Sequence, residues 1–298
     1  MARQIDKITK LVIPCAGFGT RFLPATKAVP KPLLPVLGKP TVQWVVEEAV
    51  ASGIAEIIFV IMKGHEAIID HFKYSAKLVA HLKKFNKLER LGNIENLRKK
   101  VKFRFIYQKH FYGTGFALLD ARQEVGNDPF ALVWSDEIDA LPGLGKKSVP
   151  RLKQMIDLFE KYKSPVLGVH IIDDEGTKKY GVIKGEEISA GVYKVDDILE
   201  KPGPKKAPSR IGSRAGYVLT PDIFDILAKA AKKLKPGQEL GVPNHGISAL
   251  TKKRPVYARL IKNELYDTGN VYTWLKANVE LGKMDKGFGK EFKKYLDK

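Results

Sequence analysis

Short apolar runs alternate with longer amphipathic stretches along residues 11–172. A continuous apolar run is typical of a strand buried in a parallel sheet, whereas apolar residues spaced by three and four predict a helix. The runs predict strands at 11–13, 56–61, 130–134 and 166–172, and the alternation of apolar and polar residues at 101–108 predicts a half-buried strand. The stretches between them predict helices at 41–52, 65–72, 113–125 and 149–162. This alternation predicts an α/β fold with a doubly wound, mainly parallel sheet.

Polar or small residues follow three of the predicted strands. The sequence CAGFGT at 15–20 follows the first strand, Gln108 follows the third, and Asp136 follows the fourth. Ligands bind to such a sheet outside the carboxyl ends of its strands. We therefore expect these three segments to line one site.

The loop after the first strand has the features of an anion-binding site. Gly17 and Gly19 lack a Cβ, so the backbone can turn tightly and approach a ligand. Successive N–H groups in such a turn bind anions, and Arg21, Lys27 and Lys31 add positive charge suited to a nucleoside triphosphate. The loop lacks the third glycine of the dinucleotide fingerprint and the Gly-Lys-Ser/Thr of the P-loop. Two glycines alone are equally compatible with a plain turn.

The longer sequence around this loop resembles that of the sugar-nucleotide pyrophosphorylases. The resemblance lies in GFGTRFLP at 17–24 and PKPLLP at 30–35, and TKA at 26–28 is similar to the branch that makes UDP-glucose. It implies a Rossmann-like nucleotidyltransferase fold in one domain, residues 1–298. In that domain, about 1–140 would bind the nucleotide, and about 141–270 would bind the sugar phosphate with a small β portion. Residues 271–298 would form a C-terminal helix.

The resemblance also implies roles for individual residues in the nucleotide half. Arg21 and Lys31 would act in catalysis by stabilising the triphosphate and the leaving pyrophosphate. The amide of Gln108 could pair with the imide edge of a pyrimidine, although an exposed Gln at a strand end has the same sequence. The nucleotide would be bound by Ala16, Gly17, Gly19, Thr20, Gln108 and Gly113.

Two carboxylates are candidate ligands of Mg²⁺, a hard cation that prefers oxygen. Asp136 follows a strand, and Asp267 lies in LYDTGN at 265–270, similar to the second metal carboxylate of the family. Each Asp could equally cap a helix or a turn. If the resemblance holds, both carboxylates would converge on one metal ion bridging the reacting phosphates.

Further matches imply a sugar-phosphate site made of Asp136, Gly181, Glu200 and Lys201. KYGVI at 179–183 resembles a family loop whose glycine lies against the hexose. In LEKP at 199–202, Glu200 would accept hydrogen bonds from sugar hydroxyls and Lys201 would hold the phosphate of the attacking substrate. Outside the family, this last motif would simply be a turn.

Asp136 is similar to a family Asp that serves the metal and the sugar phosphate, but Trp134-Ser135 replace the Leu-Pro that usually precedes it. The sequence departs from the family at two further places. Phe116 stands where the family usually has His, and ELGVPNHG at 239–246 replaces an acidic stretch that usually borders the sugar pocket. The second departure leaves the identity of the sugar open more than the chemistry of nucleotidyl transfer.

The net charge of the chain is +19, with 298 residues and one cysteine. Anionic substrates, a nucleic acid or a solvated lysine-rich surface would each explain such a charge. Residues 73–104 hold eleven Lys and Arg and two Glu around apolar residues at helical spacing, which predicts an amphipathic helical stretch with a basic outer face. No nucleic-acid-binding motif is present, so we expect no specific nucleic-acid partner.

The chain has neither a run of about 20 apolar residues nor the apolar core of a signal peptide. We therefore expect a cytoplasmic protein without a membrane partner. One cysteine excludes an internal disulfide. The basic segment 271–298 could mediate self-association, since similar proteins form homodimers or homotetramers.

The resulting hypothesis is a Mg²⁺-dependent transfer of the uridylyl group of UTP to glucose 1-phosphate. The same chemistry with dTTP or another hexose 1-phosphate is an alternative. A non-catalytic sensor that binds a sugar nucleotide is another.

Overall fold

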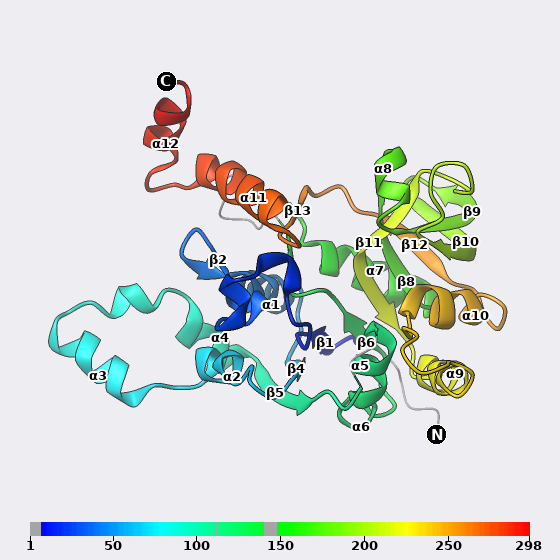
Figure 1. Ribbon diagram of the computed structural model, residues 1–298, viewed down its shortest axis with the longest axis horizontal. Coiled ribbons are helices and arrows are strands. Elements are labelled where there is room, and N and C mark those ends of the chain that lie inside the picture. Colours follow the sequence, from blue (N-terminus) through cyan, green and yellow to red (C-terminus); the bar gives the residue numbers. More distant parts are fainter. Residues whose placement is uncertain (1–6, 111–112, 140–147) are drawn as a thin grey trace.

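A large sheet with helices on both faces forms the body of the molecule (Figure 1). The structure, a computed structural model, describes residues 7–110, 113–139 and 148–298. The expected division between the two halves of the chain, near residue 140, lies outside the described residues. Within those ranges, no helix is long and apolar enough to cross a membrane.

The sheet has nine strands in the described part of the chain, in the order β5-β4-β1-β6-β11-β8-β12-β10-β9. The chain forms them as β1 (Lys10–Pro14), β4 (Glu56–Ile61), β5 (Lys102–Tyr107), β6 (Phe130–Leu132), β8 (Val166–Ile171), β9 (Gly181–Ser189), β10 (Val192–Glu200), β11 (Ile211–Leu219) and β12 (Tyr257–Leu260). Two short ladders lie beside it: β2 (Pro35–Val36) with β3 (Lys39–Pro40), and β7 (Glu137–Asp139) with β13 (Leu265–Asp267).

The half of the sheet formed by β5, β4, β1 and β6 is parallel, as expected. β1, β4 and β6 are apolar runs because both of their faces are covered by helices, whereas the edge strand β5 contains Lys102 and Arg104 and is only half-buried. In β1, Leu11 and Ile13 point into one hydrophobic core, and Val12 points into the core on the opposite face. The carboxyl ends of these four strands share one edge, where the expected site lies.

The other half of the sheet is mainly antiparallel, so the sheet as a whole is mixed. β11 pairs antiparallel with β6, β8 and β9, β10 pairs antiparallel with β9 and β12, and only the β8–β12 pair is parallel there. This half contains the small C-terminal β portion that the resemblance implied. The α/β fold class is confirmed.

The helices cover the two faces of the sheet in separate groups. The core that contains Leu11 and Ile13 includes side chains of α1, α2, α4 and α7. The core that contains Val12, on the opposite face, includes side chains of α5, α6, α9, η5 and α10. The α-helices are α1 (Thr41–Ala51), α2 (Ala67–Phe72), α3 (Ala76–Lys84), α4 (Ile94–Lys100), α5 (Thr114–Asp120), α6 (Arg122–Val125), α7 (Arg151–Tyr162), α8 (Asp174–Thr177), α9 (Asp222–Ala231), α10 (Ser248–Leu250), α11 (Val271–Met284) and α12 (Gly289–Leu296). Short helical turns are η1 (Thr20–Phe22), η2 (Ala25–Lys27), η3 (Lys31–Leu33), η4 (Leu88–Leu91) and η5 (Val242–Ile247).

Three expected helical segments are divided in the structure. Residues 113–125 form α5 and α6, and the basic stretch 73–104 forms α3, η4 and α4 before it enters β5. Residues 271–298 form α11 and α12 instead of one helix, and α12 lies at the far end of α11 from the sheet (Figure 1). The expected self-association through this segment stays a prediction.

Candidate active site

The glycine loop follows β1 directly and is closed by its own contacts. Gly19 has φ of 64°, and a Cβ there would lie 2.9 Å from the Cβ of Lys31. The Thr26 hydroxyl donates to the Gly19 carbonyl oxygen at 2.8 Å. Glycine is therefore required at position 19 both by backbone conformation and by space. Gly17 is exposed and a Cβ there would meet nothing within 4 Å, which leaves its backbone open to a ligand.

Helix α11 braces the segment that follows the glycines. The ring of Phe22, which is buried, meets Trp274 of α11 edge-on, with centroids 6.4 Å apart. The indole Nε1 of Trp274 donates to the carbonyl oxygen of Pro35 at 3.0 Å. The Asn270 side chain accepts from Thr273 N in a capping box that starts this helix. The C-terminal segment thus supports the loop that carries Arg21 and Lys31.

Asp136 and Asp267 are brought together by the short β7–β13 ladder, which pairs Asp267 with Glu137. Both the N–H and the hydroxyl of Thr268 donate to the carbonyl oxygen of Asp136 at 2.8 Å. A Cβ on Gly269 would have Asp267 Oδ1 and Asp136 Oδ2 within 4 Å, so both carboxylates approach one point. Lys31 Nζ lies 2.5 Å from Asp136 Oδ2. The structure therefore assembles the two candidate metal ligands beside one of the candidate phosphate-binding cations.

The third predicted segment lies at the same edge, after β5. The Gln108 backbone N–H donates to Ile61 O at 2.7 Å, and its side-chain amide donates to His110 O. Gly113 has φ of 97°, and a Cβ there would lie 2.5 Å from Leu240 O. Gly115 N donates to that same oxygen at 2.7 Å. The altered segment 239–246 thus packs against the loop that was expected to read the base.

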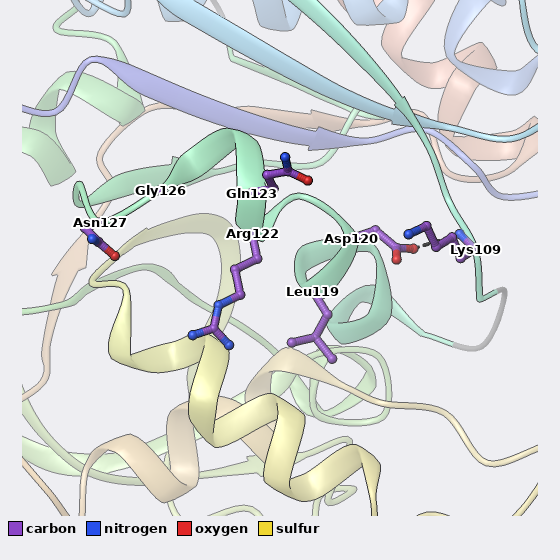
Figure 2. Close-up of a pocket in the computed structure, with 7 residues that line it drawn as sticks. All are labelled: Lys109, Leu119, Asp120, Arg122, Gln123, Gly126 and Asn127. Carbon is purple, nitrogen blue, oxygen red and sulfur yellow. Dashed lines mark hydrogen bonds between the residues drawn. The ribbon is translucent and has the colours of Figure 1, made fainter.

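A pocket of about 440 Å³ lies behind that loop, on the outer face of α5 and α6 (Figure 2). In its wall, Asp120 Oδ2 accepts from the backbone N–H of Lys109 at 2.8 Å and so anchors the residue after Gln108. Arg122 is paired with Asp225 at 2.8 Å. This pocket contains none of the predicted site residues. Its lining residues are Lys109, Leu119, Asp120, Arg122, Gln123, Gly126 and Asn127.

The candidate sugar-phosphate residues lie where β9 begins and β10 ends. Gly181 and Glu200 are register partners, and a Cβ on Gly181 would lie 3.1 Å from Glu200 Oε2. Lys201 has φ of 46°, and its N–H donates to Tyr180 O at 3.3 Å. Lys201 Nζ lies 3.6 Å from Glu200 Oε1. Burial raises the pKa of Glu200, and the neighbouring Lys201 opposes that rise.

Sequence reasoning missed a buried network of charges directly behind Asp136. Arg151 is fully buried, and its guanidinium pairs with Glu48 at 3.0 Å and with Glu137 at 3.1 Å. Its backbone N–H donates to Asp139 Oδ2 at 2.8 Å, and Asn263 donates to both oxygens of that carboxylate. The sequence does carry a signal for this network. Glu137 and Asp139 flank Ile138 in a short strand, and carboxylates buried in such a strand need a buried cation as partner.

Burial also shifts the acid–base properties of this network. It raises the pKa of Glu48 to about 7 and that of Glu137 to about 7, while the charge of Arg151 opposes both shifts. The charged form is disfavoured because the interior solvates a carboxylate less well than water does. The network is therefore an internal support with almost no exposure to solvent.

The geometry combines a glycine loop with nearby cations, two converging carboxylates, and Glu200 and Lys201 at the end of β10. A family model described as nucleotidyl transferase matches residues 10–283. The chain belongs to this nucleotidyl transferase family.

Curated relatives extend the match over nearly the whole chain. A UTP–glucose-1-phosphate uridylyltransferase of Bacillus subtilis is 36% identical over 291 residues, which cover 98% of this chain and 95% of the relative. A UTP–glucose-1-phosphate uridylyltransferase of Streptococcus pneumoniae is 37% identical over 292 residues, which cover 98% of this chain and 96% of the relative. The resemblance to the sugar-nucleotide pyrophosphorylases is confirmed.

Solved structures of family members have the same fold. A UDP-glucose pyrophosphorylase complexed with UDP-glucose has a TM-score of 0.83 and 34% identity, covering 93% of this chain and 99% of the other. A UTP-bound UGPase from Acinetobacter baumannii has a TM-score of 0.86 and 28% identity, covering 98% and 99%. These similarities show that the whole nucleotidyl transferase architecture is present in this chain.

Proposed function

We propose that this protein transfers the uridylyl group of UTP to glucose 1-phosphate, giving UDP-glucose and pyrophosphate. The observation that carries this proposal is the convergence of Asp136, Asp267 and Lys31 beside the glycine loop. It stands in a chain that is 36% identical, over 98% of its length, to a uridylyltransferase of that specificity.

The chemistry follows from the charges of the two substrates. An oxygen of glucose 1-phosphate attacks the α-phosphorus of UTP, and the bond from that phosphorus to the departing pyrophosphate breaks. The attacking oxygen is already anionic near neutral pH, so the protein needs no general base. Its task is to align two anions and to compensate the charge that builds up between them.

The residues of the parallel half would hold UTP. Backbone N–H groups of the loop containing Ala16, Gly17, Gly19 and Thr20 would bind the triphosphate. Arg21, which is exposed, and Lys31 would stabilise the departing pyrophosphate. Gln108 would exchange its internal bond to His110 O for the pyrimidine, with Gly113 beside it.

The residues at the antiparallel half would hold glucose 1-phosphate. Glu200 would accept hydrogen bonds from sugar hydroxyls across Gly181, its neighbour in the ladder. Lys201 would exchange its contact with Glu200 for the phosphate of the substrate. Asp136 would face both substrates from between these two groups of residues.

The carboxylates of Asp136 and Asp267 fit a divalent cation, and Mg²⁺ is the ion we propose. In the described ranges, no group of three or more His, Cys, Asp or Glu could hold a metal ion by itself. Mg²⁺ is commonly bound through one or two carboxylates together with substrate phosphates, which matches this pair. Bound there, it would supply positive charge to the phosphate oxygens. Lys31 would then leave Asp136 for the triphosphate.

The proposal is tested by pyrophosphate release in the presence of Mg²⁺, with UTP, dTTP or CTP paired in turn with several hexose 1-phosphates. We expect release to be fastest with UTP and glucose 1-phosphate. Asp136→Asn should lower that rate by about 10²–10³-fold, because it removes one electrostatic group from the reacting centre.

The matched control is Asp225→Asn, which removes an exposed carboxylate of α9 that pairs with Arg122 of α6. It should leave the rate unchanged. Release with another substrate pair only would keep the chemistry and assign the specificity to segment 239–246. Binding of UDP-glucose without any release would leave a sugar-nucleotide sensor in place of an enzyme.

A further inference from the structure

Strand β11 carries an irregularity at the point where it passes the candidate site. Ser213 pairs with Val169 of β8 and Tyr217 pairs with Leu167, so four steps along β11 are matched by two along β8. Gly216, within this bulge, has φ of 101°, and a Cβ there would lie 2.6 Å from Leu132 O. Bulges of this kind re-aim a side chain and are common beside active sites. The side chain re-aimed here belongs to Arg214.

The guanidinium of Arg214 contacts three segments that are far apart in the sequence. Its Nε lies 3.8 Å from Glu137 Oε1, and its Nη2 donates to Leu265 O at 3.4 Å. Its Cζ lies 5.2 Å from the centre of the Tyr180 ring. The two polar contacts are long for their kind, and the buried Nε has no hydrogen-bond partner among the described residues. Arg214 therefore acts through its charge and its position more than through any one hydrogen bond.

Each of these three contacts adjoins a candidate site residue. Glu137 follows Asp136, Leu265 begins the strand that ends at Asp267, and the carbonyl of Tyr180 accepts the N–H of Lys201. Burial raises the pKa of Tyr180. The charge of Arg214 opposes this rise, and the carboxylate of Asp267 adds to it. Through these contacts, Arg214 joins the β7–β13 ladder to the segment that begins β9.

Arg151 is the nearer cation to Glu137, at 3.1 Å against 3.8 Å for Arg214, but Arg151 also pairs with Glu48. The Arg214 side chain also retains 17% exposure, whereas Arg151 has none. One arginine is therefore enclosed in the protein, and the other lies between the enclosed network and the candidate site.

We propose that Arg214 is a positioning residue for the hexose 1-phosphate, holding the Tyr180–Gly181 segment in register with Asp136 and Asp267. The proposal rests on the proposed function, since it assigns the sugar phosphate to this half of the site. Without Arg214, Tyr180 and the Lys201 backbone that it holds would shift relative to the two carboxylates. The glycine loop at 15–20, which we propose to bind UTP, takes part in none of these three contacts of Arg214 and would keep its geometry.

The test compares Arg214→Met with wild type in two assays. In steady-state kinetics, we expect the KM for glucose 1-phosphate to rise about tenfold or more and the KM for UTP to stay within about twofold, since tenfold corresponds to losing about one moderate interaction. In titration calorimetry, the affinity for UDP-glucose should fall by a similar factor while that for UTP is retained. The control is Arg259→Met, which removes another sheet arginine whose Nη1 donates to Ala190 O.

Two further variants keep the test decisive if Arg214→Met folds poorly. Arg214→Lys retains the charge without the planar fork and should recover part of the loss. Tyr180→Leu removes the ring but keeps Arg214, and it should again affect glucose 1-phosphate and UDP-glucose selectively. Equal losses for UTP and UDP-glucose, or no loss in either, would overturn the proposal. A wild-type protein that binds UDP-glucose without releasing pyrophosphate would refute the proposed function instead, and the calorimetric comparison would still decide the role of Arg214.

Discussion

Two layers of carboxylates lie one behind the other in this structure and differ in what compensates their charge. The inner layer of Glu48 and Glu137 is buried and shares the guanidinium of Arg151. The outer layer of Asp136 and Asp267 is partly exposed, and Lys31 contacts Asp136. The inner charges are compensated within the protein, so they cannot be offered to a ligand. The outer pair lies partly exposed beside the glycine loop, and this difference supports our proposal that it is the chemical centre.

Removing Arg151 would break the inner layer, and we expect it to have the largest effect of these changes, seen in the free energy of unfolding. Arg151→Met leaves the carboxylates of Glu48 and Glu137 buried without their cation, and breaking such a pair costs about 3–5 kcal/mol. We expect the free energy of unfolding, measured in urea, to fall by that amount. The matched control is Arg210→Met, which removes an exposed arginine paired with Asp174 and should change it by less than about 1 kcal/mol. Similar stabilities for the two variants would refute a structural role for the inner layer.

Removing Lys31 would sharpen the contrast by altering only the outer layer. Lys31→Met should lower kcat/KM about 10²-fold, because a positioned cation is lost from the reacting phosphates. Lys27→Met, which removes an exposed cation four residues earlier in the same segment, should lower it less than about threefold. Pyrophosphate-release kinetics of the two variants measure the difference. Equal losses would mean that the net charge of the segment matters, and the contact with Asp136 does not.

The pH dependence of stability gives a smaller and separate signature of the inner layer. The pKa of Glu48 is raised from its ordinary 4.5 to about 7, so the folded protein keeps a proton that the unfolded chain releases between those values. Stability from this group is thus fully present below pH 4.5 and is lost as pH rises through about 7. Relative to Glu48→Gln, wild type should lose up to about 1.4 kcal/mol per pH unit over that range.

Urea unfolding of wild type and Glu48→Gln at several pH values measures this slope, and the comparison cancels titrating groups that do not share Arg151 with Glu48. One of these is His170, whose pKa burial lowers to about 4 and whose effect on stability has the opposite sign. Parallel curves for the two proteins would show that Glu48 does not hold a proton in the folded state.

The parallel half of the fold could be predicted from sequence because its signals are local. Continuous apolar runs predict β1, β4 and β6 within a few residues, the alternating segment 101–108 predicts β5, and the glycine loop, Gln108 and Asp136 follow these strands at one edge. The order of the remaining strands could not be predicted, since β11 enters between β6 and β8 by pairings between distant segments. Local periodicity carries no information about such pairings.

The candidate site was predictable only where a motif marked it. Asp267 stands in a recognisable motif, and Asp136 is indicated by its place directly after a buried strand, although its preceding residues depart from the family. Arg151 and Arg214 stand in no such motif. Their roles come from burial and from a bulge in the sheet, which depend on how distant strands meet.

The contact between Trp274 and Pro35 has a consequence for the biosynthesis of the protein. The two residues are 239 positions apart, and Asp267 lies shortly before Trp274 in the chain. A ribosome therefore completes the glycine loop long before it makes the helix that supports it and the second carboxylate that faces it. Until that helix emerges, the nascent chain can form β1 and its loop but has no assembled centre for catalysis, so activity should begin only at a late stage of translation.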